Sequence, residues 1–137
     1  MSATFRTTRL VEFADTDMAG IVHFASFFRF MESAEHAFLR ARGLSVVLDW
    51  EGVKIGFPRV SASCDFLKPV RFEDVLDVTV TVERVGRSSV TYAVEFAKDG
   101  EAVARGQITA VCCRFLAPGQ LETYPMPLAL RDRLVSD

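Results

Sequence analysis

A short acidic segment contains the residues of this chain that are best suited to chemistry. It reads EFADTDMAGIVHF over residues 12–24 and places Asp15 and Asp17 two positions apart, shortly before Gly20. A carboxylate can attack a carbonyl carbon directly, or it can deprotonate a water molecule that does so. Acidic residues are also common in turns, and the spacing alone favours an ordinary turn over a catalytic site.

A predicted helix over residues 24–42 follows the acidic segment. Apolar side chains recur there at intervals of three and four residues, with polar residues opposite, and Gly43 provides a helix stop. The free N–H groups and positive dipole end of this helix would lie a few residues from Asp17, where they would stabilise a negatively charged oxygen. The apolar stripe comprises Phe24, Phe27, Phe28, Met31, Ala34 and Phe38.

The rest of the chain favours strands. Alternating apolar and polar residues, separated by turn residues, predict five strands and an α+β fold in which an antiparallel sheet wraps around one helix. The Asp-Gly of the KDGE segment suits a type I′ hairpin turn. No repeat or linker divides the chain, so one domain is expected over residues 1–137. The predicted strands are 5–13, 57–67, 75–85, 88–97 and 102–116, with a short helix in the tail at 125–135.

Composition excludes several classes of protein. The 137 residues are 50% hydrophobic with a net charge of -2, which argues against a disordered chain and against a broad nucleic-acid surface. No apolar run is long enough for a membrane helix, so no membrane insertion is expected, and the N-terminal residues lack a signal-peptide pattern. The odd number of cysteines predicts reduced thiols in the cytoplasm, and no metal site is expected. The cysteines are Cys64, Cys112 and Cys113.

Two segments carry a resemblance to a known family. FADTDMAGIVHFASFFRFMESAEHAFLRARGL at residues 13–44, followed by LKPVRFEDVLDVTVTVERVGRSSVTY at residues 67–92, resembles the hotdog-fold acyl-CoA thioesterases. The similarity is greatest to the 4-hydroxybenzoyl-CoA thioesterase group and its Tol–Pal-associated and 1,4-dihydroxy-2-naphthoyl-CoA relatives. It implies a hotdog fold with a five-stranded antiparallel sheet around one long helix. It also implies hydrolysis of an acyl- or aryl-CoA thioester, with coenzyme A as part of the substrate and no separate cofactor.

The resemblance also assigns roles to residues of the acidic segment. Asp17 matches the catalytic carboxylate, as nucleophile or general base, and the backbone amide of Phe24 matches the oxyanion donor. Gly20 would allow the backbone to approach the substrate, and Asp15 is interpreted as shaping the turn. Several relatives carry a histidine at the position of Phe24. His23 therefore has two open interpretations, as a polar wall or proton donor beside the acyl pocket, or as a residue of the helix entry.

Two further groups of polar residues have competing interpretations. The turn containing Arg84, Arg87, Ser88 and Ser89 matches a turn that helps to bind the coenzyme A nucleotide in the family, and it is equally typical of a solvated hairpin. Glu35 falls on the apolar stripe, where an unpaired carboxylate is costly, so a partner such as Arg59 or Arg105 is expected. The alternative is a catalytic acid on the helix, either Glu32 or Glu35.

Two other functions remain possible on this fold. A hydratase or dehydratase requires a histidine paired with an acid, and the sequence shows no convincing pair. A non-catalytic acyl-CoA-binding protein would keep the pocket without needing Asp17. Phe24, Phe27, Phe57 and Phe66 would suit an aromatic or medium-length apolar acyl group, and they are equally typical of a hydrophobic core. Because a single sheet around one helix leaves an exposed edge, a homodimer or homotetramer is expected.

Overall fold

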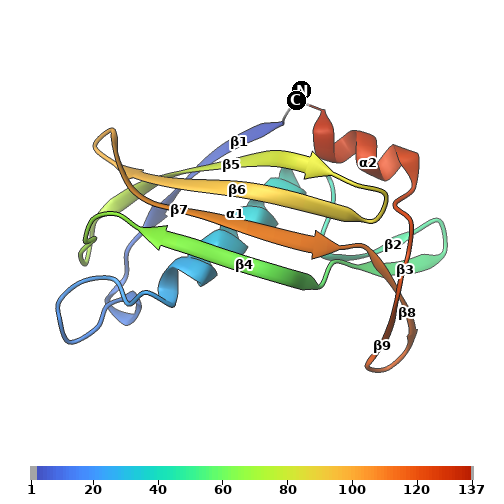
Figure 1. The fold of residues 1–137 in the computed structure, drawn as a ribbon, viewed down its shortest axis with the longest axis horizontal. Coiled ribbons are helices and arrows are strands. Elements are labelled where there is room, and N and C mark those ends of the chain that lie inside the picture. The colour runs from blue at the N-terminus through green and yellow to red at the C-terminus, as the bar shows by residue number, and fades with distance from the viewer. Residues whose placement is uncertain (1–2, 137) are drawn as a thin grey trace.

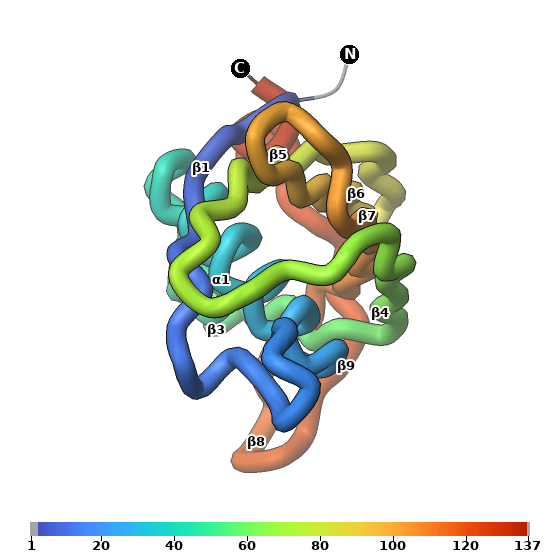
Figure 2. The backbone as a smooth tube through the Cα atoms, turned by 90° about the vertical axis from the view of Figure 1, so that its left-hand side faces the viewer, coloured from blue at the N-terminus to red at the C-terminus, as the bar shows by residue number. Residues whose placement is uncertain are grey.

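The alternation along β5 (Val75–Val85) shows how the main sheet forms its core. Leu76, Val78, Val80 and Val82 are buried on one face of the strand, as the sequence pattern predicts. The structure is a computed structural model that describes residues 3–136. Its main sheet is antiparallel, has five strands in the order β1-β5-β6-β7-β4, and curves around α1 (Figures 1 and 2).

The bounds of the elements complete this description. The helices are η1 (Phe13–Asp15, a 3-10 turn), α1 (Ser26–Ala41) and α2 (Leu128–Val135). The other strands are β1 (Thr4–Leu10), β2 (Val47–Trp50), β3 (Val53–Gly56), β4 (Arg59–Phe66), β6 (Ser89–Lys98), β7 (Glu101–Val111), β8 (Cys113–Ala117) and β9 (Gln120–Thr123).

Helix α1 packs its apolar stripe against the sheet, and one contact is especially close. A Cβ atom built on Gly106 of β7 would lie 2.1 Å from Sδ of Met31, so the absence of a side chain at Gly106 allows the helix to approach the strand. The helix begins two residues later than predicted. Phe24 consequently lies outside it and is 61% exposed, so its assignment to the buried stripe was wrong.

The prediction of an α+β fold with an antiparallel sheet and a long helix is confirmed, but the five-strand description is incomplete. A second sheet of four strands, in the order β2-β3-β8-β9, lies at one end of the molecule (Figure 1). The long strand predicted over residues 102–116 is interrupted at Cys112, whose N–H donates to the Ser88 carbonyl at 2.6 Å. The first strand ends at Leu10 rather than at residue 13.

Several turn predictions are confirmed by the backbone. Asp99 and Gly100 both have positive φ, as a type I′ turn requires, and Gly43 ends α1 with φ of 71°. A single buried cluster joins residues near both ends of the described chain, from Ala3 to Leu134. No helix within residues 3–136 combines the length and the apolar composition needed to cross a membrane.

Candidate active site

A pocket of about 530 Å³ lies between the acidic loop and the segment that follows β4. Its walls are almost entirely apolar, and the charged residues among them are Asp17 and Lys68. An acyl group would therefore be surrounded by hydrocarbon and aromatic surface with a carboxylate within the same pocket. The pocket is lined by Asp17, Ile21, Val22, Phe24, Phe27, Phe66, Leu67, Lys68, Pro69 and Val70.

The backbone of the acidic loop fixes the carboxylate of Asp17. The Asp17 N–H donates to the Ile21 carbonyl at 2.9 Å, and the Ala19 N–H donates to Oδ1 of Asp17 at 2.9 Å. Gly20 turns the chain with φ of 80° and donates its N–H to the Asp17 carbonyl at 3.0 Å. One carboxylate oxygen thus accepts a local hydrogen bond, while Oδ2 accepts none from residues 3–136.

Asp15 has a different environment, although it is only two positions away. It is 4% exposed, and its Oδ2 accepts the Glu12 N–H at 2.9 Å and an Arg9 guanidinium N–H at 3.4 Å. Arg29 lies 3.6 Å from its other carboxylate oxygen. These contacts fit the interpretation of Asp15 as a residue that shapes the turn.

The entry to α1 leaves one backbone amide free. The N–H of His23 donates to the Asp15 carbonyl at 2.8 Å, that of Ala25 to Nδ1 of His23 at 3.1 Å, and that of Ser26 to the His23 carbonyl at 2.8 Å. The Phe24 N–H makes no hydrogen bond to any residue in the described range 3–136. The family resemblance assigns this amide as the oxyanion donor. It is therefore the one amide in this turn whose N–H is available to donate a hydrogen bond to a bound ligand.

His23 takes part in the helix entry. Its ring is exposed, stacks on the Phe24 ring at a centroid distance of 4.7 Å, and accepts the Ala25 N–H through Nδ1. It is not among the residues that line the pocket. The geometry therefore favours the helix-entry interpretation over a role as proton donor in the pocket.

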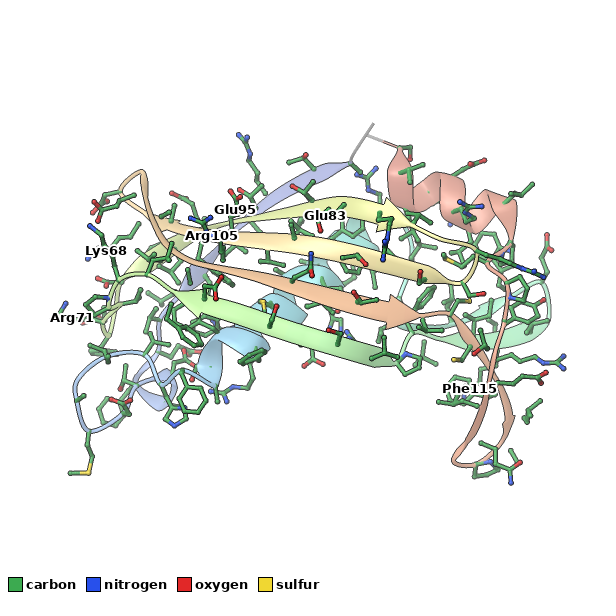
Figure 3. All side chains as sticks on the ribbon, viewed as in Figure 1. Lys68, Arg71, Glu83, Glu95, Arg105 and Phe115 are labelled. Atoms are coloured by element: carbon green, nitrogen blue, oxygen red, sulfur yellow. The ribbon has the colours of Figure 1, made fainter. Side chains whose placement is uncertain are left out.

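A main-chain hydrogen bond joins the two walls of the pocket, and the second wall is also bonded to Val103 of β7. The Val22 N–H donates to the Val70 carbonyl at 2.7 Å, and the N–H groups of Leu67 and Lys68 both donate to the Val103 carbonyl. The Lys68 ammonium pairs with Glu101 at 3.0 Å, and the side chain lies at the same end of the molecule as the acidic loop (Figure 3). The second wall therefore has a fixed position relative to Asp17.

A comparison with known families decides the assignment. The sequence model of the thioesterase superfamily matches residues 19–104, which is more than half of the chain. The chain belongs to the thioesterase superfamily. The predictions of a thioester hydrolase and of a hotdog fold are therefore confirmed.

Individual relatives agree with this assignment. The chain is 34% identical over 122 residues to the 1,4-dihydroxy-2-naphthoyl-CoA hydrolase of Thermosynechococcus vestitus, which covers 88% of this chain and 82% of the relative. It is 32% identical over 112 residues to the enzyme of the same name from Nostoc punctiforme, with 80% and 74% covered. The crystal structure of a 1,4-dihydroxy-2-naphthoyl-CoA thioesterase from Synechocystis superposes with a TM-score of 0.82 at 26% identity, covering 96% of both chains.

The turn predicted to bind the nucleotide lies far from the pocket of this thioesterase domain. Strand β5 begins next to Val11, just before the acidic loop, where the Val11 N–H donates to the Asp74 carbonyl, and it ends at Val85. Arg84 lies at the end of β5 and Ser89 at the start of β6, so only Arg87 and Ser88 of the predicted set lie in the turn itself. An eleven-residue strand spans about 33 Å, and Figure 1 shows the two loops at opposite ends of the sheet. One chain does not bring together Asp17 and the residues Arg84, Arg87, Ser88 and Ser89.

Glu35 is paired as the sequence predicts. It is 1% exposed, and its Oε1 accepts a short hydrogen bond from Nη2 of Arg59, which also lies 3.0 Å from Nε2 of His36. Burial raises the pKa of Glu35, although the Arg59 charge opposes the shift. Neither Glu35 nor the exposed Glu32 lines the pocket of Asp17. Glu32 and Arg59 instead line a separate groove of about 280 Å³ between α1 and β4.

Two residues of the site were missed from the sequence. Ser26 is 1% exposed and bonds the Asp15 carbonyl, and Lys68 lines the pocket. A serine at the start of a phenylalanine-rich helix is a signal for Ser26, because serine is favoured where helices begin. The cysteines show no sign of activation: burial raises the pKa of both Cys64 and Cys112 to about 11.

Proposed function

We propose that this protein hydrolyses an acyl- or aryl-CoA thioester to the free acid and coenzyme A, with Asp17 as the catalytic carboxylate. The observation that carries the proposal is the meeting of Asp17 and Phe24 in one apolar pocket, where the Phe24 N–H has no partner within residues 3–136. The names of the relatives, which are hydrolases or thioesterases of 1,4-dihydroxy-2-naphthoyl-CoA, support the class of substrate.

The proposed reaction has two alternative routes. The Asp17 carboxylate attacks the thioester carbonyl, the C–S bond breaks to release the coenzyme A thiolate, and water then hydrolyses the mixed anhydride. Alternatively, Asp17 takes a proton from water as the water attacks the same carbon, and the tetrahedral intermediate expels the thiolate. In both routes the carbonyl oxygen gains negative charge and accepts the Phe24 N–H. Protein groups and water suffice, so we propose no cofactor.

The acyl group we propose is aromatic or a medium-length apolar chain. Phe66 packs against Phe27 with ring centroids 5.5 Å apart and against Phe24 at 6.3 Å, and all three line the pocket. Edge-to-face and tilted ring contacts of this kind also accommodate an additional aromatic ring.

We also propose that the protein forms a homodimer or homotetramer. Strand β4 is at the edge of the main sheet, and Val60 on it is 63% exposed, which is unusual for an edge that faces only water. A second copy is also what the nucleotide assignment requires, because the turn at Arg87 lies at the far end of the sheet from the pocket of its own chain. Arg84, Arg87, Ser88 and Ser89 would then serve the pocket of a neighbouring copy.

The other functional classes receive less support. The two histidines of the chain are His23 and His36, and neither bonds a carboxylate within residues 3–136, whereas a hydratase would need such a pair. A non-catalytic acyl-CoA-binding protein would not require a carboxylate in the pocket. The three free cysteines suit a reducing compartment, and we propose the cytoplasm.

Single-turnover hydrolysis of benzoyl-CoA by two folded variants tests the catalytic role. Asp17→Asn keeps the size of the side chain and removes both the nucleophile and the base, so the rate constant should fall at least ~10²-fold. Binding should survive, because the apolar walls and the Phe24 amide remain. Glu35→Gln is the matched control for the helix carboxylate. If Asp17→Asn retains its rate while Glu35→Gln loses it, the catalytic acid is on the helix.

A further inference from the structure

We infer that Ser26 is a positioning residue that fixes the Phe24 amide for the oxyanion. The inference rests on the proposed function, because it assumes that the Phe24 N–H binds the thioester oxygen. Ser26 itself is buried beneath the helix entry and does not line the pocket, so it acts through the backbone rather than by touching the substrate.

The Ser26 hydroxyl links the acidic loop to the helix. It donates to the backbone carbonyl of Asp15 at 2.9 Å and accepts from Nη2 of Arg29, one helical turn later, at 2.8 Å. The same Asp15 carbonyl accepts the His23 N–H at 2.8 Å. One carbonyl oxygen therefore holds the residue before Phe24 through its main chain and the second residue after Phe24 through its side chain.

This arrangement places Phe24 between two anchored neighbours. Ala25, the remaining residue of the segment, is held through its N–H by His23. The carboxylate of Asp15 is in turn held by the Glu12 N–H, Arg9 and Arg29, so the residue that carries the common acceptor cannot shift without breaking these polar contacts. A donor that is already fixed before the charge develops stabilises an oxyanion most effectively, because no reorganisation is required during the reaction.

Loss of the hydroxyl should change the chemical step more than substrate binding. In Ser26→Ala, the His23 contact remains while the link from helix to loop is lost, and the Phe24 N–H gains freedom to turn away from the carbonyl oxygen. We expect kcat to fall about 10- to 100-fold, which is no more than the loss caused by misplacing or removing an oxyanion donor. KM should change less than about threefold, because the pocket walls are untouched. Ser33→Ala, an exposed serine on the same helix, is the matched control and should leave both constants unchanged.

A second variant tests the same link without emptying a buried position. The Arg29 side chain is exposed to solvent, so the Arg29→Met variant should fold even if Ser26→Ala does not. It removes the donor to the Ser26 hydroxyl and the Arg29 contact with the Asp15 carboxylate. It leaves the Ser26 bond to the Asp15 carbonyl, so kcat should lie between wild type and the values expected for Ser26→Ala.

The decisive readout is the carbonyl stretching frequency of benzoyl-CoA bound to the Asp17→Asn variant, which should hydrolyse it at least ~10²-fold more slowly than wild type. A hydrogen bond from the Phe24 N–H lowers this frequency relative to benzoyl-CoA in solution. We expect Ser26→Ala or Arg29→Met, added to Asp17→Asn, to return the frequency toward its solution value, which a general loss of stability would not do.

The outcomes separate the inference from the proposed function. A lowered frequency in Asp17→Asn that neither Ser26→Ala nor Arg29→Met changes would overturn the inference alone. If Asp17→Asn hydrolyses benzoyl-CoA at the wild-type rate, or shows no lowered frequency with benzoyl-CoA bound, the proposed function fails and the inference fails with it.

Discussion

Arg59 on the edge strand β4 donates a hydrogen bond to Glu35 on the buried face of α1. The contact engages only Oε1 of the carboxylate, and Oε2 of Glu35 has no hydrogen-bond partner within residues 3–136. Burying a carboxylate is costly unless it is paired, so the two residues depend on each other unequally. Arg59 is partly exposed and can be hydrated, whereas Glu35 cannot.

This asymmetry predicts different costs for removing each partner. Arg59→Met would leave Glu35 as an unpaired buried carboxylate and should lower the free energy of unfolding by about 3–5 kcal/mol at pH 7. Glu35→Gln removes the buried charge and should cost clearly less. Urea unfolding at one protein concentration measures both, with Arg40→Met, an exposed arginine on α1, as the control. Equal costs for the two changes would contradict the asymmetry.

The raised pKa of Glu35 predicts how this difference depends on pH. Burial raises the pKa of the folded state above the ordinary value of 4.5, so the folded protein binds a proton at Glu35 more tightly than the unfolded chain does. The stabilisation that comes from this tighter proton binding is fully present below pH 4.5, and it is lost as the pH rises through the pKa of Glu35 in the folded protein. The free energy of unfolding of wild type, relative to Glu35→Gln, should therefore decrease on going upward from pH 4.5 and then level off. A relative increase over that range would show that the Arg59 charge outweighs burial.

Substitutions of Arg87 in the distant turn and of Lys68 in the pocket should affect kcat/KM differently when the substrate carries the nucleotide of coenzyme A. If Arg87 binds a phosphate of coenzyme A, Arg87→Ala should reduce kcat/KM for a benzoyl-CoA substrate about 10- to 100-fold, as expected for a lost charge-assisted bond. Benzoyl-pantetheine, which lacks the nucleotide, should be unaffected. Lys68→Ala is the matched control, because Lys68 is already paired with Glu101. A loss specific to benzoyl-CoA in Lys68→Ala, with none in Arg87→Ala, would place the phosphates at the mouth of the pocket of the same chain.

The exposed edge of β4 predicts the surface of self-association. Val60→Lys places a charge on that edge, and static light scattering should show a smaller assembly than wild type at micromolar concentration. Val47→Lys makes the same change at an exposed valine of the smaller sheet and should leave the mass unchanged. A wild-type monomer under these conditions would refute both the assembly and the assignment of Arg87 to a neighbouring pocket.

The fold was predictable from the sequence wherever side-chain patterns are regular. The alternation in β5 gave its two ends correctly, and the position of Glu35 on an apolar stripe was enough to predict a partner such as Arg59. The four-stranded sheet was not predictable in this way, because its strands are short and its pairing joins distant segments, such as Ile55 with Arg114. The prediction that Phe24 is buried was wrong because the helical period was extended into the turn that precedes the helix.

The site was predictable as a motif but not as an arrangement. The resemblance of the acidic segment to the thioesterases predicts roles for Asp17 and Phe24, whereas the role proposed for Ser26 depends on a carbonyl oxygen whose position the sequence does not reveal. The separation of Arg87 from Asp17 follows from the direction of β5, which only the assembled sheet defines.

The hydrogen bond between Val22 and Val70 has a consequence for folding. It joins segments that are far apart in the sequence, and forming such contacts requires closure of a long loop. A chain in which α1 and the hairpins of the sheet have formed, but this contact has not, would therefore lack the pocket. During refolding, recovery of thioester hydrolysis should lag behind recovery of far-ultraviolet circular dichroism, so that activity reports the last stage of assembly.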